Sequence, residues 1–143
     1  MKRTPLSLYR FLSLAMAVIF AAVGLIFLLL PEQVLEFFNR LSPGLGLSPA
    51  PVQPGSFFPI LALAYMVLVT CLAMQMFRKP GNPTFPALLA LGKLASSLLS
   101  LFFFFARAPY LVCLANAVLD GAIAALVLWM ILMQKKHAAS WPA

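Results

Sequence analysis

Residues 85–133 have the sequence FPALLALGKLASSLLSLFFFFARAPYLVCLANAVLDGAIAALVLWMILM. It contains two apolar runs, 85–105 and 110–133, separated by only four residues. A bilayer core about 30 Å thick is crossed by a helix of about 20 apolar residues. Each run is long enough to cross, and the short connection permits only a tight antiparallel turn. The stretch therefore predicts a hairpin of two membrane-spanning helices.

Two further apolar runs of similar length lie upstream, at residues 11–30 and 57–77. Lipid cannot satisfy exposed backbone groups, and the alternation typical of barrel strands is absent from all four runs, so we expect helices throughout. The predicted fold is an all-α integral membrane protein. It consists of one domain, residues 1–143, built as a bundle of four transmembrane helices.

The composition of the 143-residue chain agrees with this fold. Hydrophobic residues make up 64% of the chain and charged residues 9%, whereas soluble domains average about 45–50% and about 25%. Such a chain cannot cover a water-facing surface. The formal net charge of +7 comes from basic residues that flank the spans in small groups. This placement favours a role in topology and lipid binding and is against a nucleic-acid partner.

The basic residues also predict the orientation in the membrane. Seven lie on the side of the termini and of the loop between the second and third spans: Lys2, Arg3, Arg10, Arg78, Lys79, Lys135 and Lys136. The opposite side has two, Arg40 and Arg107. The positive-inside rule then predicts that both termini are cytoplasmic, in a multi-pass protein of the bacterial inner (plasma) membrane. The first span is longer than the apolar core of a signal peptide and is expected to be a retained anchor.

The segment between the first and second spans has two parts. Residues 31–41 begin with a proline and an acidic residue, which suit a helix N-terminus. Their apolar and polar side chains fall on opposite arcs of a helical wheel, which predicts an outer interfacial amphipathic helix. The candidate functional residues of this helix are Glu32, Glu36, Phe37, Phe38 and Arg40. Residues 42–56 are rich in Pro and Gly and predict an extended outer linker without regular structure.

Two charges of opposite sign lie inside the predicted hairpin. Lys93 and Asp120 are nearly equidistant from the turn, so an antiparallel hairpin brings them to about the same depth. An unpaired charge in hydrocarbon costs about 2.5–3.5 kcal/mol, so the two side chains are expected to form an ion pair. A polar seam is expected around this pair, formed by Ser96, Ser97, Ser100 and Asn116.

The remaining reactive side chains suggest no catalytic or metal site. The single histidine, His137, lies beyond the last span, which excludes a haem held between two intramembrane histidines. Cys71 and Cys113 lie at different depths, which excludes a disulfide between them, and both are expected to be buried. We therefore predict no cofactor and no metal, and the sequence favours a protein that is not an enzyme.

The ion pair has two alternative roles. In the structural role it fixes the register of the last two spans, while Ala117, Gly121 and Ala125 allow close helix packing. In the functional role Asp120 titrates beside Lys93 in an ion-linked carrier. We favour an accessory or structural subunit that self-associates or binds a membrane protein partner. The alternatives are a minimal oligomeric transporter or channel that uses the pair, and a quinone-linked redox subunit with a site under residues 31–41.

The layout of the chain has three notable features. It has four short spans with cytoplasmic termini, and Gly24 precedes Pro31 and Glu32 at the end of the first span. The last hairpin contains Lys93 and Asp120. This layout resembles that of the DoxX-like small bacterial membrane proteins. The resemblance implies the four-helix fold. By analogy alone, it also links the chain to quinone-coupled or redox partners.

Overall fold

The structure is a computed structural model that describes residues 4–51, 58–137 and 141. In chain order the helices are α1 (Pro5–Leu29), α2 (Pro31–Leu41), the 3₁₀ helix η1 (Ser42–Leu45), α3 (Phe58–Arg78), α4 (Thr84–Ala106) and α5 (Leu111–His137). Four of them, α1, α3, α4 and α5, are long and apolar enough to cross a membrane. The predicted all-α class with four candidate membrane-spanning helices is therefore confirmed.

Helix α1 begins earlier than the first predicted span. Its first residue is Pro5 rather than Phe11. The Thr4 hydroxyl accepts a hydrogen bond from the Ser7 amide at 3.3 Å, and a proline in the first turn sacrifices no helical hydrogen bond. The apolar run marks the part of the helix that suits lipid, whereas capping decides where the helix begins.

Helix α5 extends past the last predicted span, from Met133 to His137. Its last turn carries three basic side chains, which interact favourably with the negative end of a helix dipole. Here too the helix continues beyond the apolar run. The predicted first residue of the second span, Phe57, and the end of the predicted linker, residues 52–56, lie outside the described residues.

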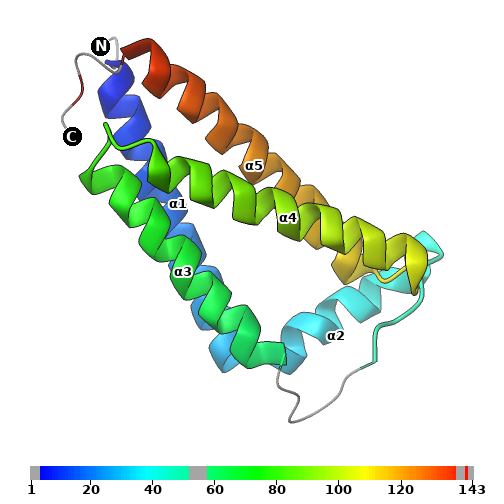
Figure 1. Ribbon diagram of the computed structural model, residues 1–143. Helices are drawn as coiled ribbons and strands as arrows, with labels where there is room; N and C mark the ends of the chain where they lie inside the picture. Colours follow the sequence, from blue (N-terminus) through cyan, green and yellow to red (C-terminus); the bar gives the residue numbers. More distant parts are fainter. Residues whose placement is uncertain (1–3, 52–57, 138–140, 142–143) are drawn as a thin grey trace.

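The long helices form two antiparallel pairs that converge at one end and separate at the other (Figure 1). Helix α1 packs along α3, and α4 packs along α5. The start of α1 and the end of α5 lie together at the convergent end, and α2 lies across the open end. The four-helix arrangement is therefore a wedge.

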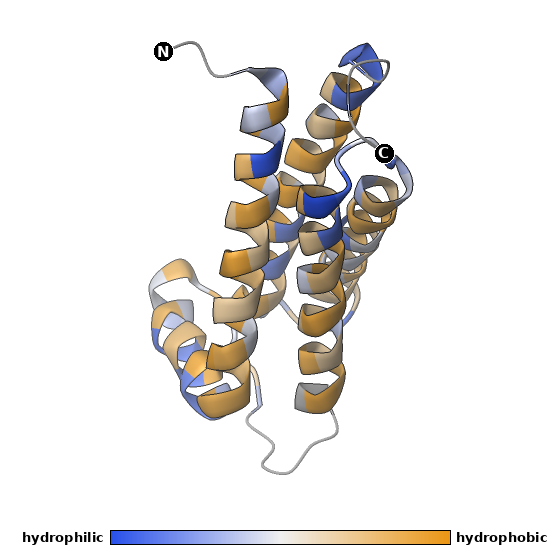
Figure 2. Ribbon diagram, turned by 90° about the vertical axis from the view of Figure 1, so that its left-hand side faces the viewer, coloured by the Kyte–Doolittle hydropathy of each residue, from blue (hydrophilic) through white to orange (hydrophobic). Residues whose placement is uncertain are grey.

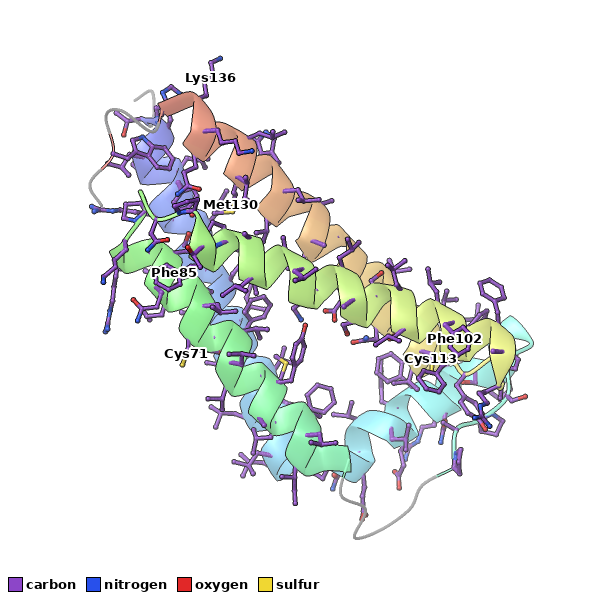
Figure 3. The ribbon with its side chains drawn as sticks, in the orientation of Figure 1. Cys71, Phe85, Phe102, Cys113, Met130 and Lys136 are labelled. Carbon is purple, nitrogen blue, oxygen red and sulfur yellow. The ribbon has the colours of Figure 1, made fainter. Side chains whose placement is uncertain are left out.

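The densest packing is at the convergent end of the wedge. Its fully buried side chains come from all four long helices: Tyr9, Met76, Leu89, Val127 and Met130. Figure 3 shows Phe85 and Met130 at this end and Phe102 and Cys113 at the other. In the most apolar stretch of each long helix only 22–28% of the residues are buried. Most residues of these helices are hydrophobic (Figure 2), and many of their large apolar side chains are exposed, as contact with lipid or partner helices requires.

The segment after α2 differs from the extended linker that we predicted. Residues 42–45 form η1. The Asn39 side chain donates to the Ala50 carbonyl and accepts from the Ala50 amide, both at 2.8 Å. Ser48 forms a β-bridge with Tyr110, which precedes α5. These contacts fold the first part of the Pro- and Gly-rich segment back onto the open end of the wedge.

Candidate functional site

The two buried charges meet between α4 and α5. The Lys93 ammonium donates a hydrogen bond to Asp120 Oδ1 at 2.7 Å. The two side chains are only 4% and 6% exposed. The predicted ion pair is therefore confirmed, and it has the short distance of a charge-assisted hydrogen bond.

Two aromatic rings from the other helix pair complete the surroundings of the ammonium. Lys93 Nζ lies 4.9 Å from the centre of the Phe20 ring and 5.0 Å from that of Tyr65. A ring face attracts a cation at these distances. Lys93 of α4 is thus in contact with α5, α1 and α3 at once. The ion pair connects the two halves of the wedge as well as the two helices of the hairpin.

The polar residues predicted around the pair join α4 to α5. Ser97 Oγ donates to the Ala117 carbonyl at 2.7 Å. The Asn116 side-chain amide donates to Ser96 Oγ at 3.2 Å and to Ser100 Oγ at 2.8 Å. All four predicted seam residues therefore lie at one helix interface. The sequence could not predict which carbonyl accepts the hydrogen bond from Ser97, because every residue carries a backbone carbonyl.

Small residues permit the close approach of α4 and α5. A Cβ atom at Gly121 would lie 3.1 Å from Ser97 Oγ, which is shorter than ordinary contact. Ala117 is buried, as predicted, but Ala125 is exposed and Ala124 is buried in its place. At about 100° per residue, Ala124 returns to within about 20° of Ala117, whereas Ala125 lies about 80° away.

A cavity of about 610 Å³ lies between the two helix pairs and ends on the ion pair. Its walls are almost entirely apolar and come from all five α-helices. The polar residues that line it are Tyr65, Lys93, Ser96, Asn116 and Asp120. Val34 and Phe38 contribute the lining from α2. Of the predicted pair and seam residues, Lys93, Ser96, Asn116 and Asp120 thus line an apolar chamber, whereas Ser97 and Ser100 do not.

The predicted residues of α2 divide between this cavity and the surface. Phe38 lines the cavity, whereas Phe37 is exposed. Arg40 lies 3.7 Å from Glu36 with both side chains exposed, and such a surface pair contributes little to stability. Glu32 is exposed in the first turn. The location of α2 at a membrane surface stays a prediction.

Both cysteines are free, with Cys71 exposed and Cys113 half-buried. Figure 3 shows them on different helices and well apart. The expected burial of both is wrong, because Cys71 faces the apolar outer surface, which a small apolar thiol suits. In the part of the chain that the structure describes, no group of three or more His, Cys, Asp or Glu side chains could hold a metal ion.

Sequence reasoning misses two residues of the site, Phe20 and Tyr65. They belong to α1 and α3. Residues 79–83 join α3 to α4 by a short turn, but no short turn joins α1 to the hairpin, and the angle at which the α1/α3 pair packs on the hairpin follows from neither connection. One signal was available. Tyr65 is the only tyrosine in the interior of a predicted span, and a buried tyrosine hydroxyl usually has a hydrogen-bonding role.

Four long apolar helices, with a buried, ring-covered ion pair and a cavity between them, are typical of a small multi-pass membrane protein. In comparisons with known proteins, no family model, no curated protein and no solved structure matches the chain. The resemblance to the DoxX-like proteins stays a prediction, and the proposals below rest on the geometry of this chain.

Proposed function

We propose that the chain is a non-catalytic accessory or structural subunit of a bacterial plasma membrane, associated with another membrane protein or with a second copy of itself. The observation that supports this function is the pairing of the two buried charges with each other inside the chain. Lys93 is held by Asp120 at 2.7 Å and covered by two rings. A pair held in this way fixes the positions of helices.

The packing on the side of the ion pair that faces the convergent end favours the accessory or structural role over transport. A carrier must expose its titrating group to each side of the membrane in turn. Leu89, one turn from Lys93, and Val127, about two turns from Asp120, are both fully buried. They belong to the core of the convergent end, which lies between the ion pair and the start of α1 and end of α5.

The exposed apolar faces supply a surface for association. With 22–28% of the residues in the spans buried within the chain, most of each helix remains available to lipid or to a partner helix. Without a hydrophobic driving force between helices in lipid, association depends on close packing and interhelical hydrogen bonds. The exposed side of α4, with Leu91, Leu98 and Phe102, is a candidate contact face.

The charge distribution supports cytoplasmic termini. Three basic residues belong to helix ends that converge: Arg10 near the start of α1, Arg78 at the end of α3 and Lys135 in the last turn of α5. At the open side, Arg40 lies in the last turn of α2 and Arg107 directly follows α4. Alkaline phosphatase fused after the last residue is expected to be inactive, because it requires export. Phosphatase inserted in the outer segment is expected to be active. The reverse pattern would contradict this orientation.

The proposed role predicts a stable assembly and no transport. The tagged full-length chain, extracted in mild detergent, is expected to elute as a stoichiometric complex with a membrane protein or as a homo-oligomer. In liposomes with a pH gradient it is expected to leave the internal pH of the vesicles unchanged relative to protein-free vesicles. A monomer without partners would contradict the accessory role. Proton flux that Asp120→Asn abolishes would establish the transporter instead.

A further inference from the structure

The cavity between the helix pairs has the properties of a small-molecule site. Its volume is about 610 Å³, within the range of about 300–1,000 Å³ that is typical of such sites. Its walls are apolar except for a few polar groups at one end, which is the usual arrangement for fixing the orientation of a ligand. At about 30 Å³ for each water-sized group, it has room for roughly twenty.

One hydrogen-bond donor in the cavity wall lacks an acceptor. The Tyr65 hydroxyl is buried and makes no hydrogen bond with the described residues. Ser96 is beside it, but the two hydroxyls do not reach hydrogen-bonding geometry. Gly92 faces the same hydroxyl, since a Cβ atom there would lie 3.7 Å from it. A buried donor left without an acceptor is unfavourable, so an oxygen of a bound molecule would stabilise it.

The charges at the end of the cavity favour a neutral ligand. Lys93 and Asp120 neutralise each other at 2.7 Å, and no other Lys, Arg, His, Asp or Glu is among the described lining residues. An anion would have to displace the Asp120 carboxylate from the ammonium, and a cation would have to compete with Lys93. Breaking a buried pair in either way leaves an uncompensated charge.

The depth of the site distinguishes it from ordinary phospholipid binding. Asp120 is nine residues after the first residue of α5, about 14 Å along the helix and near the middle of a hydrocarbon core about 30 Å thick. A phospholipid could bring only the methyl end of an acyl chain to this depth, and that end offers no acceptor to Tyr65. A molecule with one chain and a neutral carbonyl end could bring its oxygen there.

We propose that the cavity binds a neutral, single-chain lipophilic molecule with its carbonyl end inward. The carbonyl oxygen accepts a hydrogen bond from Tyr65, and the chain lies between the helix pairs toward Phe38 of α2. This binding activity goes beyond the accessory role proposed above. Tyr65 is the residue that selects the carbonyl, while the apolar walls accept the chain.

The test uses 2-pentadecanone as the ligand and pentadecane as the matched hydrocarbon. The full-length protein in lipid nanodiscs is labelled with a photoreactive diazirine derivative of the ketone, and each unlabelled compound competes for the labelling. Mass spectrometry is expected to locate the label on cavity residues. The ketone is expected to compete about 2- to 10-fold more strongly than the alkane, as one net hydrogen bond provides.

Tyr65→Phe removes the hydroxyl and keeps the ring against Lys93. It is expected to abolish the advantage of the ketone and to leave competition by the alkane unchanged. Tyr110→Phe is the matched control, because Tyr110 is not among the lining residues, and it is expected to retain the advantage. A second variant, Ala62→Phe, places a ring in the cavity and is expected to reduce labelling by the ketone probe.

Three results would overturn the proposal. One is equal competition by ketone and alkane in the wild-type protein, which would mean that the cavity takes hydrocarbon chains alone. Another is an advantage of the ketone that survives Tyr65→Phe. The third is labelling confined to the outer helix surface. None of these results bears on co-purification of a partner, so the accessory role and the binding site can fail separately.

Discussion

Lys93→Met alone is expected to destabilise the folded protein by about 3–5 kcal/mol, the usual cost of removing one partner from a buried ion pair. The variant leaves the Asp120 carboxylate, only 6% exposed, without its cation. Asp120→Asn is expected to cost a similar amount, because ring faces attract a cation far less than a carboxylate does. Abundance in membranes and the thermal midpoint of purified protein measure both effects.

The double variant Lys93→Met/Asp120→Asn distinguishes two causes of instability, an unpaired buried charge and the loss of side-chain packing. With both charges removed, most of the abundance is expected to return. Lys136→Met, an exposed lysine at the end of α5, is the control and is expected to change stability by no more than about 0.5 kcal/mol. Single variants with wild-type abundance would contradict the structural role. A double variant that is abundant but defective would show a further function of the charges.

Gly121→Leu is expected to force α4 and α5 apart. Even the first side-chain atom at this position would lie 3.1 Å from Ser97 Oγ, and Leu adds three further carbons in the same direction. Overpacking of this kind costs about 1–3 kcal/mol. The neighbouring hydrogen bond from Ser97 to the Ala117 carbonyl is expected to be lost as well, at about 1 kcal/mol. The thermal midpoint and the abundance in membranes report the sum.

Two further glycine variants provide a comparison for the loss of stability expected of Gly121→Leu. Gly121→Ala is expected to cost less than the Leu variant, since a small shift of Ser97 accommodates one methyl group. Gly44→Leu is the matched control, because no atom lies within 4 Å of a Cβ at that position, and it is expected to change stability by no more than about 0.5 kcal/mol. A Gly121→Leu protein with the thermal midpoint of the wild type would contradict the close approach of the helices.

The sequence predicts best what short connections determine. Four residues join the last two spans, so counting from the turn is enough to pair Lys93 with Asp120 and to align Ser97 with α5. A longer segment joins α1 to α3, and whether Phe20 and Tyr65 reach Lys93 depends on the angle at which the two helix pairs pack together. The angle between the pairs, and the cavity that it creates, follow from this packing and not from any local pattern.

The segment after α2 is a second case in which a local sequence pattern did not predict the structure. Its Pro and Gly content predicted an extended linker, whereas the two hydrogen bonds between Asn39 and Ala50 close a loop across eleven positions. Composition describes the average behaviour of a segment. A single amide side chain with a suitable backbone partner is enough to override it.

The separation of Lys93 from Asp120 along the chain also has a consequence for biogenesis. The two residues are 27 positions apart, and a ribosome adding about 5–20 residues per second needs about 1–5 s to cover that distance. During this interval α4 carries a lysine whose counter-charge has not yet been synthesised. Insertion of α4 and α5 into the bilayer together, as a preformed hairpin, avoids the exposure of that lysine to lipid. Synthesis of α5 thus completes the insertion of α4.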